Sequence, residues 1–148
     1  PSEIGAAFGL VQLRKFKKFN KTRNYNFKLH LKFFNTFPEY FILPKVDKNI
    51  KTNFLAFPII IKTNKNFDRK KLQVYLENNQ IQTRPIFTGN LLRHPAFRKI
   101  ISKKNKLSMF KNADYIMKNG ILIGCHQGLK KRNIEYIHSK IKQFILKN

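Results

Sequence analysis

Four side chains of types that often bind ligands lie within eleven residues of one another. Arg84, Asn90, Arg93 and His94 belong to the stretch Ile81–Phe97, which reads IQTRPIFTGNLLRHPAF. The stretch begins as a strand, and α/β proteins often place ligand contacts at the carboxyl ends of strands. The four residues therefore indicate a candidate binding site, with a surface loop and ordinary helix capping as the alternative.

The local pattern around these residues predicts a strand, a turn and a short helix. Residues 81–88 alternate as a strand does, with Phe87 on the same face as the first residue. Pro85 is expected to end regular pairing because it lacks a backbone donor. Gly89-Asn90 then turns the chain, since both residue types tolerate positive φ. Pro95 suits the first turn of a short helix after the loop.

Cys125 and His126 are adjacent, and cysteine–histidine pairs occur in nucleophilic enzymes and in metal sites. No metal-ligand spacing links Cys125 to the four histidines, and no carboxylate is placed in sequence to orient the pair. We therefore predict neither a catalytic residue nor a metal ligand in this chain. Cys125 is expected to be buried at the end of a strand, and His126 to lie in a loop.

Carboxylates and phosphate-binding loops are also scarce. The chain has only seven Asp and Glu residues, with no close pair that would tune a general acid against a general base. Neither the GxxxxGK[ST] motif nor the GxGxxG motif occurs. The sequence therefore offers no tuned acid–base pair and neither of these two phosphate-binding loops.

Hydrophobic periodicity predicts a mixed α/β fold. A long helix that Ser2 can cap is expected to run to about Phe37, before Pro38. The predicted architecture is this helix plus a three-stranded, largely antiparallel sheet covered by helices on one side. The further predicted elements are a loop over 38–53, a strand over 54–62 with Pro58 at an edge or bulge, a helix over 68–79, a basic loop over 102–108, a helix over 113–118 that Asn119-Gly120 stops, a strand over 121–125, and a final helix whose inner face carries Ile134, Ile137, Ile141 and Phe144 or Ile145.

Composition limits the possible fold and protein class only broadly. The chain has 148 residues, which suits one domain with a modest core. Its hydrophobic content of 42%, with fifteen Phe, indicates a folded chain. The longest apolar run is too short to cross a bilayer, and no basic-then-apolar leader opens the sequence. The single cysteine excludes an internal disulfide and fits a reducing compartment, so we expect a cytoplasmic protein without a membrane partner.

The formal net charge of +24 would ordinarily point to nucleic acid or an anionic membrane. The basic residues are 24 Lys and only 7 Arg, scattered from end to end. Lys, Asn, Ile and Phe make up nearly half of the chain, and all four have codons rich in A and T. Genome bias therefore explains the charge. No RNP-like strand or Arg-rich recognition helix occurs, so specific nucleic-acid binding is not expected.

Three blocks of the sequence resemble the C-terminal domain of the DegT/DnrJ/StrS family of pyridoxal-phosphate sugar enzymes. They read PSEIGAAFGLVQLRKF, IQTRPIFTGNLLRHPAF and ADYIMKNGILIGCHQGL, and they occur in the family's order. The GNLLRHPAF segment is most similar to the subgroup of nucleotide-linked 4-keto-6-deoxyhexose 3-dehydratases of lipopolysaccharide sugar synthesis. The resemblance implies the small C-terminal α/β domain of fold-type-I enzymes over residues 38–148 and a linking helix over residues 1–37. The large cofactor-binding domain would lie outside this chain, which begins with Pro1 and is expected to be a piece of a longer protein.

The resemblance also implies roles for individual residues. In the family this domain closes over the cofactor domain and helps to enclose the nucleotide sugar. Arg84 offers a planar fork of donors for a diphosphate or carboxylate, and Asn90 can bond sugar hydroxyls in both directions. Arg93, His94 and His126 complete the expected substrate-binding set; the first two would add positive potential, and Phe87 would form an apolar wall.

The implied complete enzyme binds pyridoxal or pyridoxamine phosphate, acts on a nucleotide sugar and forms a homodimer. The cofactor-anchoring motif, with its Lys or the His of the dehydratases, is missing here, so no catalytic residue is assigned, and the chain alone is expected not to turn over a substrate. Some members of the subgroup carry an iron–sulfur cluster. The cysteines of that cluster precede this region, so Cys125 is not expected to be one of them.

Two alternatives remain open from the sequence. A sugar aminotransferase of the same family would share the cofactor and this domain. From a different class, a small basic module could bind nucleic acid or acidic partners. Cations gathered on one face with exposed aromatics would favour the module, whereas an even spread with an exposed apolar patch over residues 4–13 would favour a domain detached from its partner.

Overall fold

The structure is a computed structural model, and it describes residues 2–63, 66–100 and 107–148. Most of the basic loop predicted over residues 102–108 lies outside the described residues. Four helices, three short 3-10 helices and four strands make up the part that the structure describes. In chain order they are α1 (Glu3–Phe34), β1 (Phe41–Ile42), β2 (Ala56–Ile61), α2 (Arg69–Asn78), β3 (Thr83–Pro85), η1 (Leu91–Arg93), η2 (Pro95–Ile100), η3 (Leu107–Phe110), α3 (Lys111–Asn119), β4 (Gly120–Gly124) and α4 (Lys131–Leu146).

The strands form one antiparallel sheet in the order β1-β2-β4-β3. The prediction of a mixed α/β fold with an antiparallel sheet is confirmed, but the sheet has four strands where the sequence predicts three. The added strand, β1, has only two residues and pairs with Ile60 and Ile61. It lies inside the segment predicted to be a loop. The sequence does not show this strand, because two residues form a strand only through pairing with a partner.

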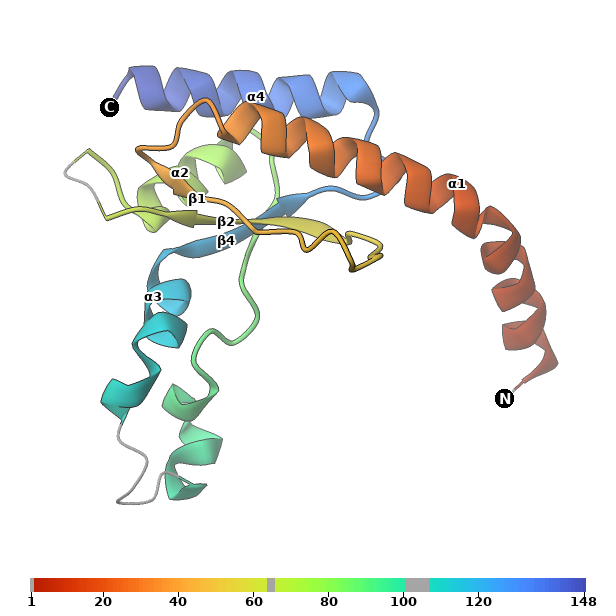
Figure 1. Cartoon of the computed structure of the whole chain (residues 1–148), viewed down its shortest axis with the longest axis horizontal. Coiled ribbons are helices and arrows are strands. Elements are labelled where there is room, and N and C mark those ends of the chain that lie inside the picture. The colour runs from red at the N-terminus through yellow and green to blue at the C-terminus, as the bar shows by residue number, and fades with distance from the viewer. Residues whose placement is uncertain (1, 64–65, 101–106) are drawn as a thin grey trace.

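Figure 1 shows α1, α2 and α4 on one face of the sheet and α3 on the other side. The prediction that all helices cover one side therefore fails for α3. The core lies between the sheet and helices α1, α2 and α4. In β2, Phe57, Ile59 and Ile61 face this core, while the residues between them are half-buried on the opposite face. From β4 the core receives Ile121 and Ile123.

The helices begin and end where the sequence chemistry predicts, within a few residues. The side chain of Ser2 accepts from the backbone N–H of Gly5 at the start of α1, and Asp68 caps α2 in the same way through Lys71. Helix α1 ends at Phe34, three residues before the predicted Phe37. In α4 every predicted inner residue is buried, which confirms the periodicity argument; they are Ile134, Ile137, Ile141, Phe144 and Ile145.

Pro58 lies in β2 at a point where β1 no longer pairs with that strand. The predicted strand over 54–62 is observed over Ala56–Ile61, and the last β1 pair joins Ile42 to Ile60. At Pro58 the strand therefore has a neighbour on one side only, which is Leu122 of β4. This agrees with the edge position that a strand proline requires.

The stretch 81–97 follows its prediction up to Pro85 and then departs from it. The observed strand covers only Thr83–Pro85, so the alternation does not reach Phe87, which is 86% exposed. Positive φ occurs at Phe87 (47°) and Gly89 (66°), whereas Asn90 has an extended backbone. The turn is thus made by Gly89 and a phenylalanine, because Asn90 instead caps η1. The short helix predicted after the loop is confirmed as η2.

Helix α3 is longer than the predicted 113–118 and ends without a left-handed turn. Gly120 has φ −91° and belongs to β4, so it does not act as the expected C-terminal turn glycine. A Cβ atom at Gly120 would lie 2.6 Å from Cδ1 of Ile86 and 2.7 Å from the carbonyl oxygen of Ile116. Close packing, and not backbone conformation, therefore explains the glycine at this position.

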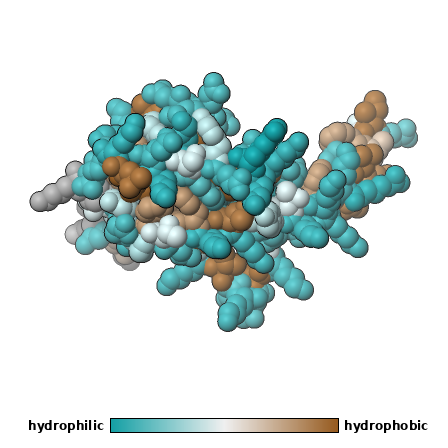
Figure 2. Space-filling view, turned by 90° about the horizontal axis from the view of Figure 1, so that it is seen from above, coloured by the Kyte–Doolittle hydropathy of each residue, from teal (hydrophilic) through white to brown (hydrophobic). Residues whose placement is uncertain are grey.

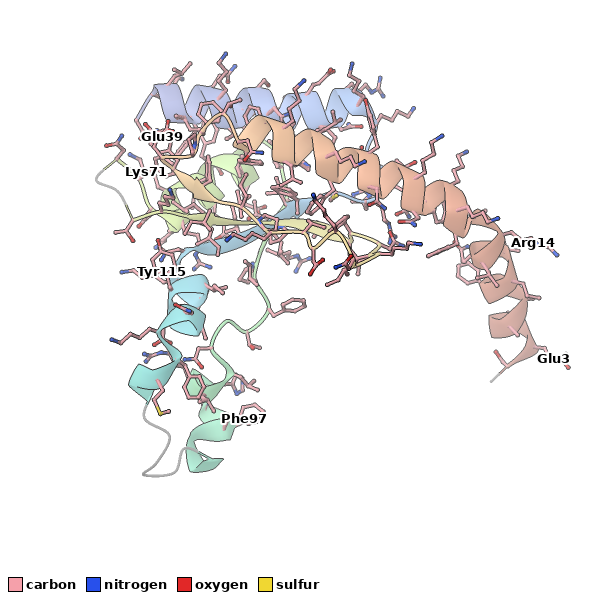
Figure 3. All side chains as sticks on the ribbon, viewed as in Figure 1. Glu3, Arg14, Glu39, Lys71, Phe97 and Tyr115 are labelled. Carbon is pink, nitrogen blue, oxygen red and sulfur yellow. The ribbon has the colours of Figure 1, made fainter. Side chains whose placement is uncertain are left out.

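The N-terminal half of α1 extends away from the body of the domain. Figure 3 shows Glu3 and Arg14 on this projecting part, far from the sheet. All buried residues of the helix belong to its C-terminal part, from Asn26 to Phe34. Figure 2 shows hydrophobic side chains gathered on the projecting end, and smaller hydrophobic patches among hydrophilic side chains on the rest of this face. Within the described residues, no helix is both long and apolar enough to span a bilayer.

Candidate functional site

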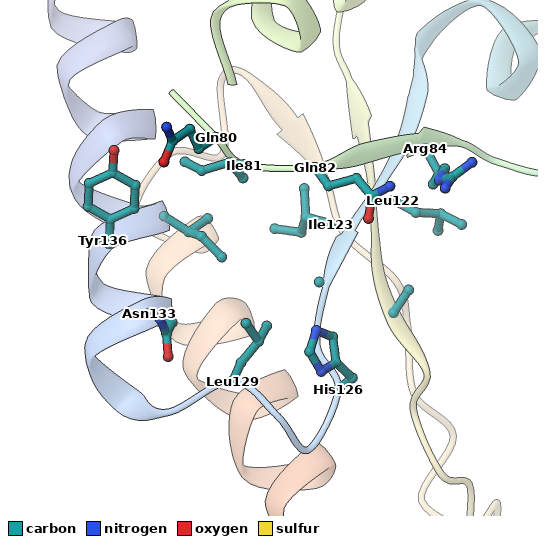
Figure 4. A pocket seen from close by; sticks show the side chains of 13 residues that line it. Gln80, Ile81, Gln82, Arg84, Leu122, Ile123, His126, Leu129, Asn133 and Tyr136 are labelled. Carbon is teal, nitrogen blue, oxygen red and sulfur yellow. The ribbon is translucent and has the colours of Figure 1, made fainter. Parts of the chain in front are cut away.

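A cavity of about 360 Å³ opens where the chain before β3 separates from the end of β4. We call it the edge pocket. Arg84 and His126 line it, together with the side chains that Figure 4 shows around it. Its floor is aliphatic and its rim carries amide groups and a phenol; the residues concerned are Ile81, Ile123, Leu129 and Ile137 for the floor and Gln80, Gln82, Asn133 and Tyr136 for the rim.

Arg84 holds its place in the pocket through strand pairing. It pairs with Leu122 of β4, and the next residue, Pro85, ends the strand. The side chain of Glu77 fixes the start of the same strand, since its Oε1 accepts from the backbone N–H (2.7 Å) and the hydroxyl (2.8 Å) of Thr83. These two bonds lower the pKa of Glu77 below its usual value. Arg84 itself is exposed, and among the described residues no carboxylate lies within salt-bridge distance of it.

His126 lies in the loop between β4 and α4, and helix α1 anchors this loop. Nδ2 of Asn26 donates to the carbonyl oxygens of His126 (3.1 Å) and Leu129 (3.2 Å), and Nε of Arg23 donates to Oε1 of Gln127 (2.7 Å). Asn26 is buried, so both bonds satisfy a side chain that would otherwise lack a partner. The ring of His126 accepts from the backbone N–H of Gly128 at Nδ1, which leaves Nε2 able to contact a ligand.

One turn further along α1, a pair of histidines joins three elements; His30 is buried and His138 is half-buried. Nε2 of His30 donates to the carbonyl oxygen of Gly124 at 2.9 Å. Its Nδ1 must therefore accept, and its partner is Nε2 of His138 at 3.0 Å. Burial lowers the pKa of His30 to about 4 and that of His138 to about 3, so both rings are neutral near pH 7. The pair thus binds α1 and α4 to the end of β4 without a buried charge.

Asn90 and Arg93 lie together at a second place, around the carboxylate of Asp114 in α3. We call these three residues the Asp114 cluster. Nδ2 of Asn90 donates to Oδ1 of Asp114 at 2.7 Å, and Arg93 bonds the same carboxylate through Nε and through Nη2, the latter at 2.6 Å. The pKa of Asp114 falls to about 2, mainly because of the bonds from Arg93 and then that from Asn90. The pKa of Arg93 is raised by the same contact.

The five residues predicted to bind substrate are therefore not brought together in one group. Arg84 and His126 line the edge pocket, whereas Asn90 and Arg93 donate hydrogen bonds to Asp114. His94 belongs to neither group, because its Nδ1 accepts from the backbone N–H of Ala96 and caps η2. For Asn90, the capping alternative is observed as well, since its Oδ1 accepts from the backbone N–H of Leu92 at 3.1 Å.

Asp114, Arg23 and Asn26 are structural partners that the sequence reasoning missed. Arg23, Asn26 and His30 have the i, i+3, i+7 spacing of one helix face, which was a usable signal for polar residues that share a target. Asp114 gave no such signal, because it lies 24 residues from Asn90. Such a pairing depends on the path of the whole chain.

Cys125 is buried and offers little chemistry. Burial raises the pKa of its thiol to about 12, and Sγ donates to the carbonyl oxygen of Arg23 at 3.5 Å. The prediction of a buried residue at a strand end is confirmed. Within the described residues, no group of three or more His, Cys, Asp or Glu side chains could hold a metal ion.

The lining of the edge pocket suits a neutral or anionic polyhydroxyl ligand and does not suit pyridoxal phosphate. No lysine and no carboxylate line this pocket, so nothing there could form a Schiff base or pair with the ring nitrogen of that cofactor. A guanidinium group, an imidazole and three amide side chains can bond phosphate oxygens and hydroxyl groups. The chemistry that these residues support is binding and orientation.

Similarity to known proteins covers nearly the whole chain. The lipopolysaccharide biosynthesis protein RfbH of Salmonella typhimurium is 30% identical over 143 residues, which are 97% of this chain and 32% of that protein. A solved structure, the GDP-4-keto-6-deoxy-D-mannose-3-dehydratase of E. coli with bound hydrated PLP, has 29% identity and a TM-score of 0.74, covering 90% of this chain and 33% of its own. The chain spans about a third of the length of the curated relatives it matches.

The fold also recurs in a more distant protein, the sugar aminotransferase Spr1654 from Streptococcus pneumoniae in its PLP form. The TM-score is 0.83 at 16% identity, with 99% of this chain and 36% of that one covered, so this likeness shows the fold alone. The sequence profile of the DegT/DnrJ/EryC1/StrS aminotransferase family matches residues 2–142, and the chain belongs to this family.

Proposed function

We propose that this chain is the C-terminal part of a PLP- or PMP-dependent enzyme that removes the 3-hydroxyl of a nucleotide-linked 4-keto-6-deoxyhexose. The observation that carries the proposal is the identity to dehydratases, which is 29–31% over most of the chain in RfbH-like and GDP-sugar relatives. Solved sugar aminotransferases of the same fold have only 15–16% identity. A dehydratase therefore fits better than an aminotransferase.

In this proposal the chain supplies substrate contacts and the cofactor domain supplies the reaction centre. The exposed half of α1 supports that division, because Ile4, Phe8 and Leu13 are 84%, 67% and 69% exposed. Several exposed apolar side chains on one helical segment indicate a surface that another part of the protein covers. We propose that residues 1–37 link the two domains, that residues 38–148 form the small domain, and that the complete enzyme is a cytoplasmic homodimer.

A basic nucleic-acid module is the weaker proposal, because the cations do not gather on one face. Exposed lysines occur on all four helices, for example Lys21, Lys70, Lys118 and Lys142. These helices lie on both sides of the sheet (Figure 1). Single-strand binding proteins instead combine one basic groove with aromatic platforms.

The deciding experiment uses the complete enzyme that contains this chain. It is incubated with PMP and a GDP- or dTDP-linked 4-keto-6-deoxyhexose, and the products are identified by mass spectrometry. Loss of the 3-oxygen from the sugar supports the dehydratase. A 4-amino sugar formed with an amino-acid donor, without loss of oxygen, would instead establish the aminotransferase.

Arg84 gives the first mutational prediction. In the complete enzyme, Arg84→Gln should raise the KM for the nucleotide sugar about tenfold, because one charge-assisted contact to a phosphate is worth roughly 1.4 kcal/mol or more. Arg84→Lys should recover only part of this, since an ammonium group lacks the planar fork. Arg132→Gln, an exposed change on α4, is the matched control. Equal KM values for all three variants would exclude Arg84 from the site.

A further inference from the structure

The loop after β3, which covers residues 86–94 and includes η1, lies along one face of α3. A Cβ atom at Gly89 would fall 2.4 Å from Cβ of Met117, so the loop backbone touches the helix at this point. Three residues after Met117, Gly120 packs against Ile86 at the start of the loop. Three residues before Met117, Asp114 accepts a hydrogen bond from Asn90. Because contacts at three-residue steps follow one helix face, the loop is seated on α3 along its length.

Only one of these contacts is polar, and it holds two loop residues at once. Asn90 is 3% exposed, and its Nδ2 has Asp114 as its acceptor. Arg93 forms a two-pronged pair with the same carboxylate. Removing the carboxylate would leave the Nδ2 group of a buried asparagine without a partner, which costs more than losing an exposed ion pair. Asp114 is therefore more than a surface salt-bridge partner.

The loop held in this way presents Phe87. This side chain is 86% exposed, and its backbone has φ 47°, a conformation that bulky residues rarely adopt. Such a conformation persists only where the surrounding structure imposes it, and it occurs most often at functional sites. Phe87 lies beside Ile86 and Leu122 on the wall of an apolar groove of about 640 Å³, and this groove adjoins the edge pocket because Ala56 and Leu122 line both.

We propose that Asp114 is the positioning residue of this loop: by binding Asn90 and Arg93 it holds Phe87 as an apolar wall of the nucleotide-sugar site. The contact of Phe87 with a nucleotide sugar rests on the proposed function. The tether, by which we mean the bonds from Asn90 and Arg93 to Asp114, rests only on the contacts above. It assigns Asn90 and Arg93 to the support of the site, and the contact with the ligand to Phe87.

The tether is tested first by hydrogen exchange on this chain. Four loop amides are hydrogen-bonded and can report on loop order; they belong to Gly89, Leu92, Arg93 and His94. Asp114→Ala removes the acceptor of both Asn90 and Arg93 and should lower the protection of these amides about tenfold or more while amides of α4 keep theirs. The matched control is Glu135→Gln, which also removes one carboxylate from an ion pair but on α4. If Asp114→Ala fails to fold, Arg93→Gln removes the Arg93 part of the contact and should lower the protection of the same amides.

The link to the substrate is tested in the complete enzyme. Asp114→Ala and Phe87→Ala should each raise the KM for the nucleotide sugar about tenfold with little change in kcat or in the absorbance of the bound cofactor. The double variant should be no worse than Phe87→Ala alone, because Asp114 acts through Phe87. Glu135→Gln should match the unaltered enzyme.

Three results would overturn the proposal. They are full protection of the loop amides in Asp114→Ala, additive losses of kcat/KM in the double variant, and a loosened loop with unchanged kinetics. An unaltered enzyme that ignores nucleotide sugars would instead refute the proposed function. That failure is distinguishable, because the exchange experiment needs no substrate.

Discussion

Gly89 is the residue at which the loop after β3 approaches α3 most closely. We predict that Gly89→Ala lowers the free energy of unfolding by about 2 kcal/mol or more, because φ is 66° and the new Cβ would overlap Met117. Denaturant unfolding followed by circular dichroism measures the change. Gly9→Ala is the matched control, since nothing lies within 4 Å of its added Cβ and helix propensity favours alanine. Equal losses for both variants would contradict the close approach.

Arg84 and Asn90 show how far residue types alone can predict a site. Both were predicted to bind the same ligand because they are six residues apart, and the structure leaves Arg84 exposed while Asn90 is buried against Asp114. Residue chemistry identifies which groups can bond an anion or a hydroxyl. It does not identify whether another side chain of the same protein already occupies them, and that was the case for Asn90 and Arg93.

At the scale of the elements, His30 and His138 couple α1 and α4 to β4 through neutral rings. Their pKa values are lowered from 6.5 to about 4 and about 3, so the unfolded chain binds more protons than the folded chain as the pH falls below 6.5. Stability from the pair is therefore complete above pH 6.5 and is lost as the pH falls towards 4. At about 1.4 kcal/mol per unit, the loss from His30 alone is on the order of 3 kcal/mol.

Urea unfolding at a series of pH values between 7.5 and 4 tests this expectation. The double variant His30→Leu with His138→Phe should flatten the curve over that range, whereas His94→Gln, a change at an exposed ring, should leave the curve as it is. A curve for the double variant that falls as steeply as that of the unaltered chain would show that the pair does not titrate on unfolding.

The elements with their own hydrophobic period were predictable, and those that depend on distant partners were not. Helices α2 and α4 carry apolar residues at helical spacing; the predicted bounds of α2 were right to within a residue, and the predicted inner face of α4 is the buried one. Strand β1 has two residues and exists only opposite Ile60 and Ile61. Strand β3 ends at Pro85, and Phe87 then has a positive φ that takes the chain away from the sheet. The alternation of residues 81–88 did not show this change of direction.

At the scale of the molecule, the projecting half of α1 is a surface that this chain leaves open. Ile4, Phe8 and Val11 follow helical spacing and are 84%, 67% and 43% exposed. We predict that changing all three to Ser lowers self-association of the chain at high concentration, measured by sedimentation, without lowering its unfolding midpoint. In the complete enzyme the same change should destabilise the protein by about 2 kcal/mol or more, because the surface is then covered.

Leu146→Ser is the control, since Leu146 is 76% exposed at the far end of α4 and should affect neither measurement. Unchanged stability of the complete enzyme after the triple substitution would show that the cofactor domain does not cover this part of α1.

The two borders of the sheet explain why such a lysine-rich, phenylalanine-rich domain need not polymerise. On one border β1 offers two residues and is soon followed by Pro44; on the other, β3 offers three and ends in Pro85. A second molecule that docks edge to edge would find too few backbone groups to form a lasting intermolecular ladder. The shortness of these strands is thus also a safeguard against fibrils, provided by geometry and not by charge.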